Sequence, residues 1–283
     1  MTTNANDTGT QDPSGGGTPP DAGGTRQRMG KGRALLIGLG ALVVVLVIGG
    51  VILFMIASRT TAASTDTAIE DFRESSIEDR PAAPGLPAQG VYQYSVDGRE
   101  TIDGGPLSVG RDLPSLSPRI VRHTEDGFDI EWRLSGDHVE SWGYRLEDDG
   151  AHALFERSTL SVAGISATTE NEWSPPPLRL PANPEVGMTW TEEASSGDQR
   201  ITVASEISGQ ETVDVGGTPV QVVLIASTID YSGDVEGRIE DTSYYDPETG
   251  LEIRHISNAS LDDGSSKVTT RWDATLRSLD PVR

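Results

Sequence analysis

The sequence contains no cysteine. Without thiols the chain has no disulfide framework, no thiolate metal site and no cysteine nucleophile. Lysine is scarce as well, because only Lys31 and Lys267 occur, and acidic residues outnumber basic ones by 44 to 22. Since nucleic-acid binding requires a positive surface that neutralises phosphates, we expect no nucleic-acid partner.

Motifs that carry catalysis are also missing. The chain has no G-x-S-x-G nucleophile turn, no H-E-x-x-H zinc motif and no phosphate-binding loop. Its histidines do not recur at a spacing that would bring two onto one face of a local element; they are His123, His138, His152 and His255. We therefore predict no catalytic residue, no metal ligand and no cofactor, and we expect that the protein is not an enzyme.

The amino-terminal part differs in composition from the rest of the chain. Residues 1–25 are mostly Gly, Thr, Pro, Asp and Asn, and they include no aromatic residue. A segment of this kind buries too little apolar area to offset the entropy lost on ordering. We predict a disordered tail over residues 1–33, which ends in a group of four cations.

One long apolar run follows the tail. Residues 34–57 include no charged or hydrogen-bonding side chain, and as a helix they would extend ~36 Å, enough for a ~30 Å hydrocarbon core. A cleaved signal peptide and a fully buried core helix are the alternatives, but both usually have shorter apolar stretches. We predict an uncleaved, single-pass transmembrane helix over residues 34–58.

The charges beside this helix predict its orientation. Four cations precede it within residues 26–33, whereas only Arg59 directly follows it. By the positive-inside rule the tail stays in the cytoplasm, and residues 59–283 lie outside the cell membrane. This outer part is strongly acidic, because it holds 18 basic and 41 acidic residues.

Residues 59–88 begin with polar residues and end in a proline-rich stretch. Within them we predict a short helix around Ile69, Phe72 and Ile77. Because prolines stiffen the end of this segment, we interpret residues 59–88 as an extracytoplasmic linker.

From Gly90 onward, apolar and polar residues alternate. DGFDIEWRL, residues 126–134, and KVTTRWDATL, residues 267–276, are typical of strands with one buried face. Turn signals separate such segments about every 8 to 14 residues. We predict one all-β antiparallel domain over residues 89–283, either a half-barrel or a sandwich, in which the proline-rich segment 173–190 connects the two halves of the sheet.

Several aromatic residues are in phase with the apolar residues of their strands. We expect four of them to share the inner side of the sheet, namely Trp132, Trp142, Tyr144 and Trp272. That side is either a packed core or the lining of a lipid cavity. The packed core is favoured because interiors normally fill to crystal-like density. Under the second alternative, these four residues are the candidate ligand-binding residues.

The stretch YYDPETGLEIRH, residues 244–255, gathers Asp246, Glu248, Glu252 and His255. A hairpin turn explains the pattern, since Asp, Pro and Gly are the residue types that a tight turn requires. A calcium loop would need further oxygen ligands at regular spacing, which this stretch lacks. The turns LEDDGAH and LDDGSS lack them too, so we interpret all three stretches as turns between strands.

The basic tail, the anchor helix and a β domain with GVYQYSVDGRE, YYDPETGLEIRH and TTRWDATLRSL resemble uncharacterised single-pass envelope proteins of actinobacteria. The outer domain is also similar to bacterial lipoprotein-carrier half-barrels and their relatives, such as periplasmic stress-sensor domains. This second resemblance implies an antiparallel sheet curved around an apolar cavity for acyl chains. The chain departs from that pattern, because it has no lipobox cysteine and no evident amphipathic helix for the concave face.

Three functions are compatible with these observations. The first is a membrane-anchored, non-catalytic binding or interaction module of the cell envelope. The second is a lipid or lipopeptide carrier or sensor, which the resemblance implies. The third is a structural envelope protein whose acidic surface provides solubility in high salt. We favour the first, and its expected partners are the membrane and a lipid or an envelope protein.

A reporter enzyme that is active only after export tests the predicted topology. Fused after Arg283, this reporter should be active, because the positive-inside rule places the carboxyl-terminal part outside. Activity of a fusion at the same position to a reporter that functions only in the cytoplasm would contradict the predicted orientation.

Overall fold

The computed structural model describes residues 60–76, 83–104, 107–162 and 165–283. The predicted tail, residues 1–33, and the predicted transmembrane helix, residues 34–58, lie outside these ranges, as does Ile77. None of the helices within the described ranges is long and apolar enough to cross a membrane. The described residues belong to one compact unit, Val51–Arg283.

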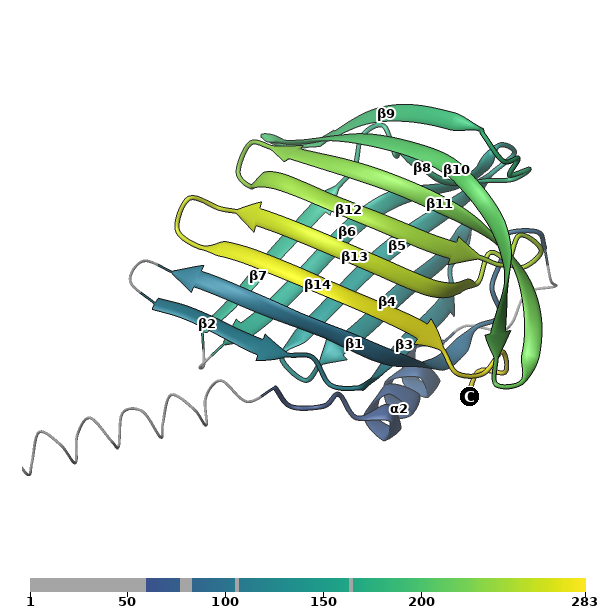
Figure 1. The fold of residues 1–283 in the computed structure, drawn as a ribbon, viewed down its shortest axis with the longest axis horizontal. Coiled ribbons are helices and arrows are strands. Elements are labelled where there is room, and N and C mark those ends of the chain that lie inside the picture. Colours follow the sequence, from purple (N-terminus) through teal and green to yellow (C-terminus); the bar gives the residue numbers. More distant parts are fainter. Residues whose placement is uncertain (1–59, 77–82, 105–106, 163–164) are drawn as a thin grey trace, which may run out of the picture. The chain divides into compact units, whose positions relative to one another are not determined.

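Fourteen strands of the described chain form one antiparallel sheet (Figure 1). They are β1 (Gly90–Gly104), β2 (Leu107–Asp112), β3 (Leu116–His123), β4 (Gly127–Ser135), β5 (His138–Glu147), β6 (Gly150–Val162), β7 (Ile165–Glu172), β8 (Leu178–Pro181), β9 (Thr189–Ser196), β10 (Gln199–Val215), β11 (Thr218–Ser232), β12 (Glu236–Tyr245), β13 (Glu252–Asp262) and β14 (Lys267–Leu276). Their order in the sheet is β7-β6-β5-β4-β3-β1-β14-β13-β12-β11-β10-β9, with β2 on β1 and β8 on β6. The predicted all-β antiparallel class is confirmed.

The sheet curves so strongly that its two ends meet (Figure 1). Ser174, just after β7, exchanges both backbone hydrogen bonds with Ser195 on β9, at N–O distances of 2.9 and 3.1 Å. The proline-rich segment 173–190 leads from β7 through β8 to β9 and thus connects the two ends of the sheet. Of the two predicted architectures, the structure is the single curved sheet, nearly closed and barrel-shaped, and not two packed sheets.

The alternation seen in the sequence determines which side chains form the core. On β4, Phe128, Ile130 and Trp132 are buried, and the charged residues between them are half-buried. The register pairs Phe128 with Tyr144 and Ile130 with Trp142 on β5. Because directly opposite residues share a face of the sheet, this register gathers the aromatic side chains on the inner side.

Helix α2 (Thr65–Ser75) lies within the segment that the sequence assigns to a linker. Its first turn is capped by Ser64, whose hydroxyl accepts a hydrogen bond from the backbone N–H of Thr67. Ala68 and Phe72 are buried against residues of β1 and β3. The predicted short helix is therefore present at Ile69 and Phe72, and it packs on the outer face of the sheet.

Truncation of Phe72 tests how firmly α2 is attached. Phe72→Ala should lower the free energy of unfolding by about 3 kcal/mol, because it removes a buried ring and leaves a cavity. Glu70→Ala, on the exposed side of the same helix, should change it by less than about 0.5 kcal/mol. Urea denaturation followed by tryptophan fluorescence measures both, and equal effects would show that the helix contributes no packing.

Candidate functional site

A cavity of about 210 Å³ lies on the inner side of the curved sheet. Side chains of β3, of β5 to β8 and of β11 to β14 line it. The exposed Asp262, the last residue of β13, and the exposed Asp263 that follows it belong to its lining, so the cavity reaches solvent at this end. We call this end the open end.

At its other end the cavity borders a second, smaller pocket of about 20 Å³. The two spaces share a group of polar and aromatic side chains, which we call the inner wall: Arg119, Tyr144, Arg179, Tyr245 and Glu252. The inner wall is therefore the polar boundary at the closed end of the cavity.

Three of the four sequence-predicted site residues line the cavity, namely Trp142, Tyr144 and Trp272. Trp132 lies behind them in the packed core, where it is fully buried and its ring centroid is 4.9 Å from that of Trp272. The structure thus contains both a packed core and a cavity on the same inner side. Ligand binding by these four residues remains a prediction.

The polar part of the lining centres on a chain of buried charges. Arg119 Nη1 lies 2.5 Å from Glu252 Oε2, and Glu252 Oε1 lies 3.0 Å from His255 Nδ1. His255 Nε2 in turn lies 3.4 Å from Asp241 Oδ1. These groups come from β3, β12 and β13, and their charges alternate in sign along the chain of contacts.

The charged state of this network follows from its geometry. Burial disfavours the carboxylate of Glu252, but the charges of His255 and Arg119 outweigh burial and hold its pKa well below the usual range. Burial also disfavours the imidazolium of His255, yet the carboxylates of Glu252 and Asp241 raise its pKa to about 10. At neutral pH Glu252 is therefore a carboxylate and His255 an imidazolium, so the network holds charges of both signs.

Glu156 and Tyr231 form a second buried contact in the cavity. The Tyr231 hydroxyl lies 2.9 and 3.1 Å from the two carboxylate oxygens of Glu156 and donates to that group. Burial raises the pKa of Glu156 to about 7, and this effect outweighs the hydrogen bond from Tyr231, which acts in the opposite direction. This carboxyl therefore changes its charge near neutral pH.

Arg179 differs from the other cations of the cavity. Within the described residues its guanidinium makes no hydrogen bond and no ion pair, although Tyr144, Asp241 and Tyr245 are its electrostatic neighbours. The hydroxyl groups of Tyr144 and Tyr245 likewise make no hydrogen bond with a described residue. The inner wall thus holds three side chains, one guanidinium and two phenols, whose donors the described part of the protein does not use.

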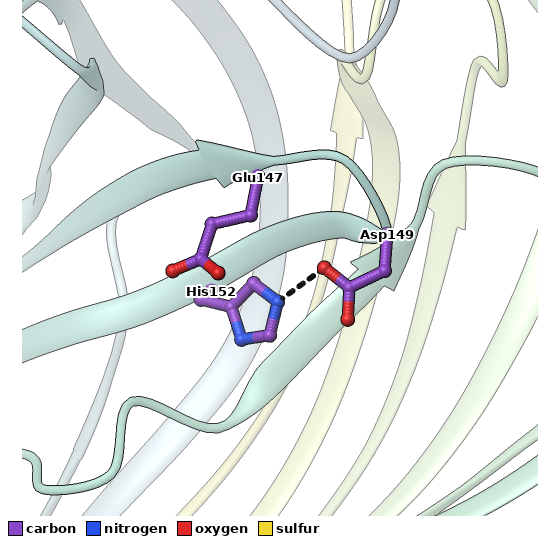
Figure 2. A group of neighbouring side chains, drawn as sticks. All are labelled: Glu147, Asp149 and His152. Carbon is purple, nitrogen blue, oxygen red and sulfur yellow. Dashed lines mark hydrogen bonds and ion pairs between the residues drawn. The ribbon is translucent and has the colours of Figure 1, made fainter.

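Outside the cavity, Glu147, Asp149 and His152 could together hold a metal ion (Figure 2). His152 Nε2 lies 2.9 Å from Asp149 Oδ1, and its Nδ1 lies 3.1 Å from the backbone oxygen of Pro176. Both ring nitrogens therefore face acceptors, which suits an imidazolium that donates twice and has no lone pair for a metal. We interpret Asp149 and His152 as an ion pair, while Glu147 pairs with Arg145.

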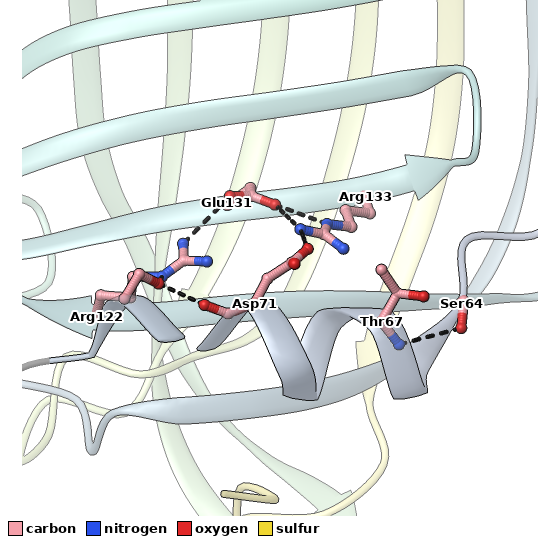
Figure 3. Close-up of polar contacts among 7 residues, drawn as sticks. Ser64, Thr67, Asp71, Arg122, Glu131 and Arg133 are labelled. Carbon is pink, nitrogen blue, oxygen red and sulfur yellow. Dashed lines mark hydrogen bonds and ion pairs between the residues drawn. The ribbon is translucent and has the colours of Figure 1, made fainter. Parts of the chain in front are cut away.

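A further polar cluster lies between α2 and the outer face of the sheet (Figure 3). Asp71 accepts from Arg133 at 2.5 Å, and Glu131 lies between Arg133 and Arg122 at 2.5 and 3.2 Å. Each of the four charged groups pairs with another member of the cluster, so the cluster positions the helix on the sheet.

The turn in residues 244–255 forms as predicted, but part of it belongs to the site. Asp246 accepts from the backbone N–H of Glu248 at 3.0 Å, and Gly250 takes a φ of 68°. Glu252 and His255, interpreted from sequence as strand residues beside a turn, are members of the buried charge network. The sequence signal for their place in the network is a charged side chain at a position where the strand pattern calls for a buried one. The sequence-based prediction did not use this signal, and it missed Arg119 and Arg179 for the same reason.

The fold and the cavity define the class of this protein: an all-β domain whose curved sheet encloses a polar and aromatic chamber. No protein-family model matches the chain, and no curated protein matches it either. Among solved structures, a hypothetical lipoprotein of Escherichia coli K12, YmcC, is similar to it with a TM-score of 0.31. The match has 14% sequence identity and covers 66% of this chain and 85% of that chain.

The buried charges predict how stability depends on pH. The pKa of His255 is raised, so its contribution to the free energy of unfolding is complete below about pH 6.5. This contribution is lost as the pH rises through about 10. His138, which lies 2.8 Å from Glu100, acts in the same direction with a pKa of about 9. Glu252 has a lowered pKa, so its contribution is complete above about pH 4.3 and is lost in acid.

The free energy of unfolding should therefore fall as the pH rises from about 6.5 to 10, and the raised pKa of Glu156 should make it begin to fall already above about pH 4.3. Denaturation at several pH values measures this slope. His255→Gln should reduce the alkaline slope, because the group that loses its proton is gone. An identical slope in the variant and the unchanged protein would contradict the charged state assigned to His255.

Proposed function

We propose that the protein is a membrane-anchored, non-catalytic binding module of the cell envelope whose cavity takes up a small amphiphilic molecule. The cavity of about 210 Å³, open at one end and lined by aromatic and unused polar groups, carries this proposal. Protein interiors normally pack to crystal-like density, so a retained space with convergent polar groups is the usual mark of a ligand site.

The volume of the cavity bears on the size of the molecule. Pockets for drug-sized ligands usually measure ~300 to 1,000 Å³, and this cavity is smaller. A ligand with one short chain or a few rings fits such a volume better than a phospholipid with two acyl chains. We therefore favour a small amphiphile over the lipid or lipopeptide carrier function that the resemblance implies.

Two members of the buried charge network, His255 and Glu252, are poorly suited to act as general bases near neutral pH. A general base must be free to accept a proton near neutral pH. His255 has a pKa of about 10 and faces carboxylates with both ring nitrogens, so it stays protonated. Glu252 is held as a carboxylate by Arg119 and His255, which leaves it a weak base.

The location in the envelope is supported by the sequence. The apolar run at residues 34–57 and the excess of cations before it favour an anchor with the β domain outside. The strongly acidic composition of residues 59–283 favours a solvated domain.

A cavity-filling variant tests the proposed function. Ala259 is buried and lines the cavity, so Ala259→Phe should occupy the space and abolish binding of the neutral fluorescent probe 1-aminoanthracene. Asn258→Phe, at the exposed neighbouring position on the same strand, should leave binding unchanged. Fluorescence titration measures both, and equal binding by the two variants would show that the cavity is not the binding site.

A further inference from the structure

Arg179 is held rigidly at the inner wall by its neighbours in the chain. Strand β8 pairs with β6 through Leu178, Leu180 and Pro181, and the indole N–H of Trp190 donates to the backbone oxygen of Leu178 at 3.0 Å. Leu180 is buried. The side chain of Arg179 therefore faces both the cavity and the small pocket from a fixed backbone position.

No direct ion pair joins Arg179 to a described residue, although Asp241 is among its electrostatic neighbours. Glu252 lies against Arg119 and His255, and Asp241 lies 3.4 Å from His255. Glu156 interacts electrostatically with Arg179, but no ion pair joins the two groups within the described residues. Because the half-buried guanidinium of Arg179 has no ion-pair partner among the described residues, the inner wall offers unused donors to one additional negative charge.

The hydroxyl groups of Tyr144 and Tyr245 complete a donor set at this point. Both tyrosines belong to the inner wall and are electrostatic neighbours of Arg179. A guanidinium presents a planar pair of N–H donors, and a phenol adds an O–H donor. A carboxylate, with two acceptor oxygens, matches such donors well, and hydrogen bonds between charged groups are the stronger kind.

The open end of the cavity carries aliphatic side chains beside Asp262 and Asp263. Four aliphatic side chains line it near the turns that close β6–β7, β11–β12 and β13–β14: Leu160, Val235, Leu261 and Val268. A molecule that fills the cavity therefore meets polar donors at the inner wall and apolar side chains at the open end.

We propose that the cavity binds a single-chain anionic amphiphile, whose carboxylate lies at Arg179, Tyr144 and Tyr245 and whose apolar chain points to the open end. This inference rests on the proposed function, because it requires that the cavity is the binding site. It adds the charge of the ligand and the direction in which the ligand enters.

Three ten-carbon compounds that differ in head group test this inference. Decanoate, decan-1-ol and decylammonium compete with 1-aminoanthracene for the full-length chain in phosphatidylcholine nanodiscs, with empty nanodiscs as the blank. Decanoate should displace the probe at a concentration at least about tenfold lower than either of the other two compounds, because only decanoate forms charge-assisted hydrogen bonds with Arg179.

Arg179→Gln should weaken the affinity for decanoate by about tenfold or more and leave the affinity for decan-1-ol unchanged. Arg238→Gln is the matched control, because Arg238 is an exposed cation paired with Asp230 and its loss changes the net charge equally. A weaker affinity for both compounds in Arg179→Gln would overturn the inference, since the loss would then concern the cavity as a whole. Tyr245→Phe is a second variant, which removes only one hydroxyl group. It should weaken the affinity for decanoate about threefold or more. An unchanged affinity for decanoate in this variant would also overturn the inference.

The outcomes separate the two proposals. Equal displacement by decanoate and decan-1-ol in the unaltered chain overturns the anionic head group but supports the cavity as a binding site. Failure of 1-aminoanthracene to bind, or its equal binding by Ala259→Phe, overturns the proposed function itself. Far-ultraviolet circular dichroism of each variant confirms that the sheet is intact before affinities are compared.

Discussion

The buried ion pair between Arg119 and Glu252 organises the inner side of the sheet. It joins β3 to β13, which are separated in the sheet by β1 and β14, and its N–O distance is 2.5 Å. On β1, Tyr94 donates its hydroxyl to the backbone oxygen of Glu252 at 2.5 Å. The guanidinium of Arg119 also lies 4.6 Å from the ring centroid of Trp132. One cation thus ties the packed core to the charged wall of the cavity.

Such a pair is not explained by stability alone. Removing two charges from water is costly, and apolar residues of similar volume often stabilise a core equally well or better. The pair does, however, neutralise Glu252, and His255 lies against both Glu252 and Asp241. With those acids engaged, Arg179 keeps its charge available to the cavity. The proposed anion site therefore depends on contacts that the ligand itself does not make.

The sequence allowed the strands to be predicted, because alternation is local and β4 and β14 show it within ten residues. It also placed Trp142, Tyr144 and Trp272 on the correct side of the sheet. The charged network could not be found this way, since Arg119 and Glu252 are 133 positions apart and meet only when the sheet curves. A helix at Phe72 was predictable from its pattern, whereas its packing on β1 and β3 was not.

The charge of the exterior opposes that of the proposed site, and this contrast constrains how an anion would bind. The chain carries a formal net charge of −22, and exposed Asp262 and Asp263 lie at the open end. Repulsion there lowers the local concentration of anions, although physiological salt screens it beyond about 8 Å. Selectivity for an anion must therefore arise at the inner wall, where Arg179 has no ion-pair partner among the described residues. Burial of the apolar chain, at about 0.8 kcal/mol per methylene, would supply the free energy that offsets the repulsion at the entrance.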